Sequence, residues 1–193
     1  ELTRYDREID YAGTNAQADA SWASEAWRRD SALFVERLTR HCHQAFNGRA
    51  ILYQVGGGSC GENGPLFDPY YGGSWYTADF SVPMTRFFRA RLRAYYEGDM
   101  DRLRAAWSDP DVTFENAQVP GRVERISAEH FALRSPHRCQ TADYYRTWSE
   151  AVEGTALAWA EAVKRGTDGE ALTATPMGSM LDCGLCGFMI HQM

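Results

Sequence analysis

The sequence predicts an α/β fold with parallel strands, because its helical and apolar segments follow one another in the order of a βαβ unit. A helical pattern over 21–46 precedes an apolar run at 50–55, and a longer helical pattern over 141–165 precedes a second run at 171–177. Neither run alternates apolar and polar residues, which is typical of strands buried on both faces of a parallel sheet. The connection between such strands is right-handed. Two strands alone do not form a stable sheet, so we expect further strands outside these residues.

The first and last predicted helices each carry one apolar stripe, with steps of three, four or seven residues. The first stripe consists of Trp27, Phe34, Leu38, Cys42 and Ala45. The last consists of Tyr145, Trp148, Val152, Thr155, Trp159 and Val163. The pair Asn47-Gly48 predicts a left-handed cap after the first helix.

Two further helices are predicted between the strands. Ser81 is a candidate N-cap, and Pro83 follows it in the first turn of a helix that reaches about Tyr96. A shorter helix is predicted from Asp99 to Trp107. Residues 108–140 contain prolines and glycine as punctuation and predict irregular structure.

Bulk composition limits the classes of protein that the chain can belong to. Its 193 residues suit one domain, which we place at 21–193 behind a polar N-terminal arm at 1–20. The net charge of −6 argues against a nucleic-acid partner. No apolar run reaches the roughly 18 residues that span a bilayer, and the first residues show no secretory pattern. Five irregularly spaced cysteines do not form a disulfide framework, so we expect a reducing, cytoplasmic location.

The segment after the first predicted strand is the candidate functional site. In parallel α/β folds, ligands bind in the loops that follow the carboxyl ends of strands. Here the chain is glycine-rich over 56–65, and the first carboxylate is Glu62, beside Asn63. Cleavage of a glycosidic bond needs one acid to protonate the leaving oxygen and a second carboxylate. Neighbouring aromatic residues would raise the pKa of Glu62 and keep it protonated, although a solvated loop acid is the plainer interpretation.

Aromatic residues make up 13% of the chain, and their positions separate two roles. Trp27, Trp148 and Trp159 lie on helical stripes and are predicted to be core residues. Trp75 and Tyr76 lie in the loop and are the better candidates for stacking against a sugar ring.

Other motifs in the sequence are weaker. The glycine run lacks the Gly-Lys-Ser/Thr ending of a phosphate-binding loop. The run His41-Cys42-His43 falls on a helix, where adjacent side chains point in different directions. The pair Cys183 and Cys186 has the spacing of half a zinc site or a redox pair, without a second pair to complete it. We therefore predict neither a metal nor a cofactor.

A succession of short motifs resembles a known enzyme family. It begins with the segment from Tyr53 to Glu62 and continues with Asp79-Phe80-Ser81-Val82-Pro83. Phe88-Arg89-Ala90-Arg91-Leu92 and Leu103-Arg104-Ala105-Ala106-Trp107 follow in the same order. Together these motifs resemble the β-galactosidase-like glycoside hydrolases of family 42 and their relatives, over roughly residues 21 to 181.

This resemblance implies a fold, a reaction and a set of site residues. The fold would be a partial (β/α)8 TIM barrel, with the runs at 50–55 and 171–177 as about its fourth and fifth strands. The reaction would be retaining hydrolysis of β-linked sugars, with β-galactosides as candidates. The acid/base would follow the fourth strand, and the nucleophile would lie at the end of a seventh strand outside this chain. We expect Glu62 in the first role, with Gln54, Asn63, Trp75 and Tyr76 lining the sugar site.

The sequence departs from the family at one position and leaves rival readings open. Family members carry an Asn-Glu pair directly after the strand, where this chain has Gly57-Gly58, and Glu62 lies four residues later. Either the acid has moved to the loop, or the chemistry is lost and the barrel only binds carbohydrate or is inactive. The expected partners are the sugar, the missing barrel segments of the parent chain and a second copy, since an incomplete barrel exposes sheet edges.

Overall fold

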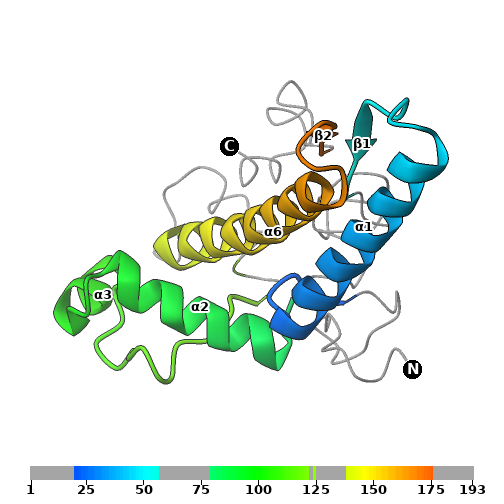
Figure 1. The fold of residues 1–193 in the computed structure, drawn as a ribbon. Coiled ribbons are helices and arrows are strands. Elements are labelled where there is room, and N and C mark those ends of the chain that lie inside the picture. Colours follow the sequence, from blue (N-terminus) through cyan, green and yellow to red (C-terminus); the bar gives the residue numbers. More distant parts are fainter. Residues whose placement is uncertain (1–19, 57–78, 122–123, 125–137, 176–193) are drawn as a thin grey trace, which may run out of the picture.

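The computed structural model describes residues 20–56, 79–121, 124 and 138–175 (Figure 1). The elements, in chain order, are α1 (Glu25–Ala45), β1 (Leu52–Gln54), α2 (Val82–Tyr95), α3 (Met100–Trp107), α6 (Arg138–Gly166) and β2 (Leu172–Ala174). The order agrees with the sequence prediction, although both strands are shorter than predicted and α6 begins three residues earlier than Thr141. The predicted arm, apart from Ala20, lies outside the described residues.

The two strands form a parallel sheet in which Leu52, Tyr53 and Gln54 pair with Leu172, Thr173 and Ala174. The N–H of Leu172 donates to the carbonyl of Ile51, and the N–H of Val55 donates to that of Ala174, both at 2.8 Å. The predicted parallel βαβ order is therefore confirmed.

Local capping chemistry sets where the helices begin and end. The side chains of Ser24 and Ser81 accept from the backbone N–H of Trp27 and Met84, which fixes the starts of α1 and α2. Asp99 does the same at the start of α3, where two N–H groups donate to its carboxylate. After α1, Asn47 has φ of 50° and Gly48 has φ of 70°, so the predicted left-handed cap is confirmed.

Helices α1 and α6 pack side by side (Figure 1), and their backbones are in close contact at Gly166. A Cβ atom at this position would lie 2.2 Å from Oγ1 of Thr39 and 2.6 Å from the carbonyl oxygen of Glu36. The Thr39 hydroxyl itself donates back to the carbonyl of Val35 at 2.9 Å. Only a residue without a side chain fits between these atoms.

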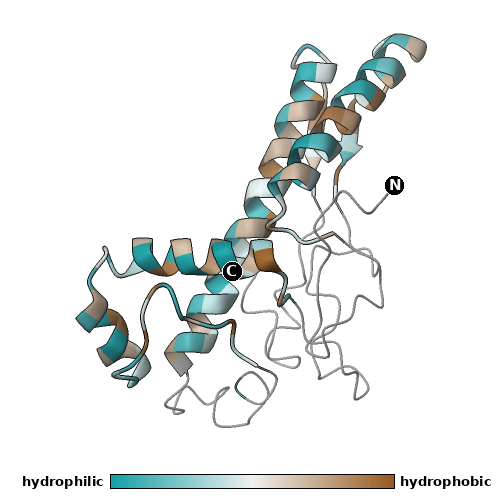
Figure 2. Ribbon diagram, turned by 90° about the horizontal axis from the view of Figure 1, so that it is seen from below, coloured by the Kyte–Doolittle hydropathy of each residue, from teal (hydrophilic) through white to brown (hydrophobic). Residues whose placement is uncertain are grey.

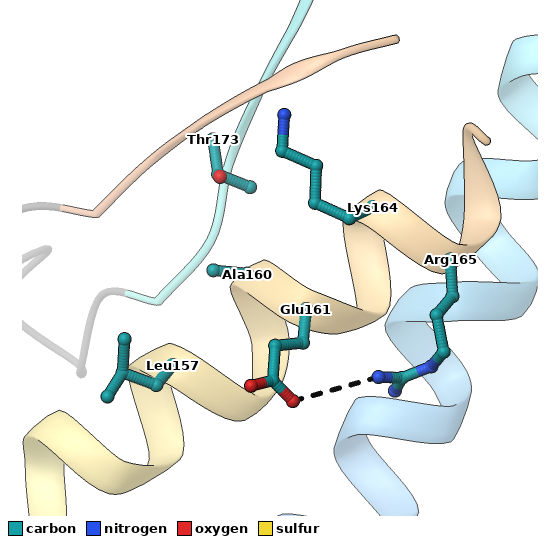
Figure 3. A pocket seen from close by; sticks show the side chains of 6 residues that line it. All are labelled: Leu157, Ala160, Glu161, Lys164, Arg165 and Thr173. Atoms are coloured by element: carbon teal, nitrogen blue, oxygen red, sulfur yellow. Dashed lines mark ion pairs between the residues drawn. The ribbon is translucent and has the colours of Figure 1, made fainter. Parts of the chain in front are cut away.

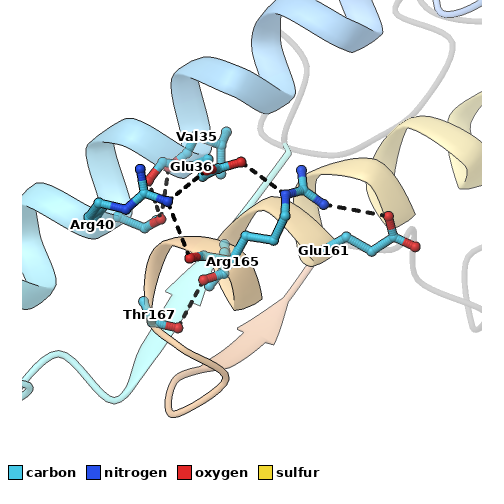
Figure 4. Close-up of polar contacts among 8 residues, drawn as sticks. Val35, Glu36, Arg40, Glu161, Arg165 and Thr167 are labelled. Atoms are coloured by element: carbon cyan, nitrogen blue, oxygen red, sulfur yellow. Dashed lines mark hydrogen bonds and ion pairs between the residues drawn. The ribbon is translucent and has the colours of Figure 1, made fainter.

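A charged network lies beside this contact (Figure 4). The Glu36 carboxylate accepts from Arg40 at 2.7 Å and from Arg165 at 2.9 Å, so it joins one arginine of its own helix to one of α6. Arg40 also lies 3.5 Å from the carbonyl oxygen of Arg165. The hydrogen bonds from Arg165 and Arg40 lower the pKa of Glu36.

Three tryptophans form the core between the first half of α1 and the second half of α6. The rings of Trp22, Trp27 and Trp159 lie with centroids 5.3 to 5.8 Å apart in edge-to-face and tilted arrangements. Trp159 also donates from Nε1 to the hydroxyl of Ser31 at 2.8 Å. Trp148 is buried on the same stripe of α6. The prediction that the helical tryptophans are core residues is confirmed.

Helices α2 and α3 pack on the first half of α6, away from the strands (Figure 1). Their apolar contacts centre on Phe88, whose ring stacks with Trp107 at 6.1 Å and meets Tyr144 of α6 edge-on at 5.8 Å. These two helices are inserted between β1 and the helix that returns to β2. None of the helices in the described ranges is both long and apolar enough to cross a bilayer.

Two sequence expectations are wrong within the described chain. In the α1 stripe, Trp27 packs on Trp159 of α6, but Phe34 is 64% exposed and Leu38 46% exposed, and the residues buried on α1 are Ala32 and Thr39. Hydrophobic and hydrophilic residues alternate along the helices (Figure 2). The strand β1 is not buried on both faces, since Leu52 is 50% exposed. Phe34, Leu38 and Leu52 are exposed because no element among the described residues covers them.

The contact at Gly166 predicts that two glycine-to-alanine changes in α6 have different effects on the free energy of unfolding. Gly166→Ala should lower the free energy of unfolding by about 2–3 kcal/mol, because backbone atoms of α1 must move apart. Gly154→Ala is the matched control, since its Cβ would meet only the Arg28 guanidinium, at 3.3 Å, and alanine favours the helix. Urea denaturation of both variants measures the difference, and equal stabilities would contradict the role of Gly166.

Candidate active site

The carboxyl ends of both strands lie at one edge of the sheet, where a site in a parallel fold is expected. Tyr53 faces the helices, with its hydroxyl 3.5 Å from the carbonyl oxygen of Thr39. Successive side chains of a strand alternate between faces, so Leu52 and Gln54 lie on the face turned away from α1. Gln54 pairs with Ala174, so both residues lie on the sheet face turned away from α1, at the carboxyl ends of the strands.

Of the five predicted site residues, the structure describes Gln54. Its side chain is exposed at the end of β1. Backbone curvature begins two residues later, at Gly56, where φ is 91°. Glu62, Asn63, Trp75 and Tyr76 lie outside the described residues, so their predicted roles stay predictions.

Asp79 stands where the described chain resumes, and its carboxylate is fully buried. Ser21 donates from its hydroxyl to Oδ2 of Asp79 at 2.6 Å, and the backbone N–H of Ser81 donates to Oδ1 at 2.8 Å. The backbone N–H of Asp79 donates to the hydroxyl of Tyr144 at 2.7 Å. A further bond of 3.1 Å joins the hydroxyls of Ser81 and Ser21. A buried carboxylate needs such donors, because loss of hydration is otherwise too costly.

This network makes Asp79 an anchor rather than a reactive group. It ties the start of α2 to the residues before α1 and to the first half of α6, and both of its carboxylate oxygens are engaged. In the sequence, the segment that contains Glu62 therefore follows β1 and precedes Asp79, whose position is fixed by these hydrogen bonds. The sequence showed Asp79 only as part of a motif. Its partner Ser21 is 58 residues away, so no local pattern could reveal the bond.

A second carboxylate, Asp143, joins the inserted helices to α6. Its Oδ2 atom accepts from the hydroxyl of Tyr96 at 2.7 Å and from Nε1 of Trp107 at 2.9 Å. Burial raises the pKa of Asp143, while the two donated hydrogen bonds and Arg146 oppose that rise. Burial and the carboxylate also raise the pKa of Tyr96. Perturbed carboxyls can mark active sites, but this one is engaged between helices.

A shallow groove lies elsewhere, on the flank of α6 against β2 (Figure 3). It is lined by Leu157, Ala160, Glu161, Lys164, Arg165 and Thr173. The charged groups in it already have partners: Lys164 donates to the carbonyl of Ala171 at 2.6 Å, and Arg165 contacts Glu36 and Glu161. The groove is therefore a poor candidate for a ligand-binding site.

Within the described ranges, no three histidine, cysteine or acidic side chains are grouped in a way that could hold a metal ion. His43 pairs with Glu170 across the helix end, at 3.3 Å. Cys42 and Cys139 are free thiols. The Cys183 and Cys186 pair lies outside the described residues.

Comparison with known proteins bears on the fold. No protein-family model and no curated protein matches the sequence. Among solved structures, the chain is similar to the catalytic domain of a β-amylase from Paenibacillus polymyxa, with a TM-score of 0.63 and 15% sequence identity. The match covers 87% of this chain and 40% of that one.

The fold is that of part of a TIM barrel. This confirms the fold class predicted from the sequence, a parallel α/β unit that matches part of a glycoside hydrolase barrel. The chain spans less than half of the β-amylase domain that it matches. The finer assignment to the β-galactosidase-like family 42 stays a prediction.

The buried anchor predicts a large effect of removing the Asp79 carboxylate. Asp79→Ala should lower the free energy of unfolding by about 3 kcal/mol, because the Ser21 hydroxyl and the Ser81 N–H each lose a buried acceptor. Glu153→Ala, at an exposed position of α6, removes the same charge and should change stability by less than about 0.5 kcal/mol. Thermal or urea unfolding of both variants tests the difference, and similar losses would refute the anchor.

The raised pKa of Asp143 predicts a pH-dependent difference between the native protein and Asp143→Asn. A carboxyl whose pKa is higher in the folded state stabilises the fold when protonated, and this contribution is lost as the pH rises through the folded-state pKa. The native protein should therefore gain stability relative to Asp143→Asn as the pH is lowered from 7 toward 4. Denaturation at several pH values measures this, and the opposite slope would contradict it.

Proposed function

We propose that the polypeptide to which these residues belong is a glycoside hydrolase, with Glu62 as its acid/base. The observation that supports this most is the match to a glycoside hydrolase barrel, in which β1 and β2 are neighbouring parallel strands. In such barrels catalytic residues lie in the loops that follow the strands. The segment that follows β1 in the sequence contains Glu62, six residues beyond Gly56.

The proposed reaction assigns a proton transfer to this chain. Glu62 would protonate the oxygen of the departing sugar as its bond to the anomeric carbon breaks, and would then deprotonate the attacking water. The second carboxylate of a retaining mechanism would attack the anomeric carbon. By resemblance to family 42 it comes from a seventh strand, so we do not expect residues 1–193 alone to turn over substrate.

Gln54 has the position expected of a sugar-binding residue. It is exposed, and it lies on the open face at the carboxyl end of β1. Its side-chain amide can both donate to and accept from sugar hydroxyls. Asn63 would add a second amide, while Trp75 and Tyr76 would stack against the ring.

Two substrate classes follow from two different observations. The sequence motifs resemble β-galactosidase-like enzymes and favour β-linked galactosides. The structural match is to a β-amylase and favours starch, the substrate that the word amylase denotes. We propose β-linked sugars first and test starch beside them.

The decisive variant is Glu62→Gln in the natural polypeptide. It should reduce kcat on substrates with a poor leaving group by about 10²–10⁴, because the departing oxygen is no longer protonated. Aryl glycosides with acidic leaving groups need less protonation and should lose much less. Product formation from both substrate types, and from starch, measures the effect.

Glu153→Gln serves as the control, since Glu153 is exposed on α6. It should leave the rates on both substrates within about twofold. Near-normal rates for Glu62→Gln would remove that residue from the role. Sugar binding without turnover by the native polypeptide would instead support the non-catalytic alternative.

A further inference from the structure

Two contacts show which side chains of the sheet face the helices. Tyr53 lies on the helix side of β1, since its hydroxyl is 3.5 Å from the carbonyl oxygen of Thr39. Thr173, its partner in the ladder, lies on the helix side of β2, because it lines the groove with Leu157 and Lys164 of α6 (Figure 3). Side chains alternate along a strand, so the neighbours of Tyr53 and Thr173 lie on the opposite face.

The remaining four side chains of β1 and β2 lie on that opposite face as two ladder pairs. Leu52 pairs with Leu172, and two residues further along each strand Gln54 pairs with Ala174. In a TIM barrel the face turned away from the helices lines the interior, where bulky branched side chains dominate. The leucines follow this rule. Gln54 and Ala174 depart from it, because one is polar and the other is small.

The departure falls at the carboxyl ends of the strands, where ligands bind in parallel α/β folds. The backbone holds the pair in register there, since the N–H of Val55 donates to the carbonyl of Ala174 at 2.8 Å. Paired strands lie about 4.8 Å apart, so the side chains of Gln54 and Ala174 leave the backbone side by side. A departure from ordinary core composition at such a place is typical of a functional site.

We propose that Ala174 is the floor of a sugar subsite in which Gln54 supplies the hydrogen bonds. This inference rests on the proposed function, since it names a residue of the same sugar site. A methyl group takes up less of the barrel interior than a leucine side chain does, and the remaining space suits the apolar C–H face of a sugar ring. The amide of Gln54 donates to and accepts from ring hydroxyls. An apolar lining with few polar groups is the usual composition of a ligand pocket.

Ala174→Leu in the natural polypeptide tests this assignment. Two probes resist hydrolysis because their glycosidic bonds contain sulfur, a β-thiogalactoside and a thiomaltoside, and calorimetric titration measures their binding without turnover. We expect the affinity for whichever probe binds to fall at least roughly 30-fold, because the added carbons occupy the space of the ring. Without a probe, the midpoint of thermal unfolding should change by less than about 2 °C, since the leucine enters unfilled space.

Thr173→Val is the matched control, because it changes the adjacent residue on the helix side. It should leave the affinity for the probe within about twofold.

Gln54→Met provides an independent measurement, since it keeps the length of the side chain and removes the amide. It should weaken binding about 10-fold through the lost hydrogen bonds. If both residues contact the same ring, the double variant with Ala174→Leu should bind at most about threefold more weakly than Ala174→Leu alone.

Four results would overturn the proposal. The first is an unchanged affinity of Ala174→Leu. The second is a fall of roughly 5 °C or more in its unfolding midpoint, which would mean that other side chains already fill the interior there. The third is a double variant whose loss equals the product of the two separate losses, and the fourth is a native polypeptide that binds neither probe. Binding that depends on Ala174 and Gln54 in a polypeptide without turnover would refute the proposed hydrolase and leave this inference standing.

Discussion

The contact at Gly166 is the constraint on which the described structure depends. The backbone of α6 approaches α1 so closely there that a Cβ atom would lie 2.2 Å from Thr39. Gly166 is the last residue of α6, and β2 begins six residues later at Leu172. The distance between the helices at this point therefore decides whether β2 can reach β1 in register. The charged network of Glu36, Arg40 and Arg165 lies beside the contact and stabilises the same geometry.

The chain between β1 and α6 is held by two carboxylates at defined points, the buried Asp79 and the partly buried Asp143. Asp79 fixes the entry to α2, and Asp143 fixes its end together with that of α3. Each carboxylate accepts hydrogen bonds from segments that are distant in sequence. A buried carboxylate with several donors is strongly position-specific, because a small displacement leaves both the charge and its donors unsatisfied. Asp79 is thus fixed at the point where the described chain resumes.

The positions of the exposed apolar residues are consistent with a unit that forms part of a barrel. Phe34 and Leu38 are exposed on α1 and Leu157 on α6, whereas Leu52 and its ladder partner Leu172 are exposed on the strands. Within an isolated domain such positions would usually be polar. In a ring of strands and helices, those on the helices would lie between neighbouring units and those on the strands would face the interior of the barrel.

The sequence by itself determined the elements, their order and the caps, because these depend on short-range patterns. Ser81 and Asn47 act as predicted, and Trp159 is in the core. Only the tertiary structure decided which face of α1 is buried, because several stripes of that helix are compatible with its periodicity and the Gly166 contact selects one. It alone revealed the anchor at Asp79, since a hydrogen bond to a residue 58 positions away leaves no local pattern.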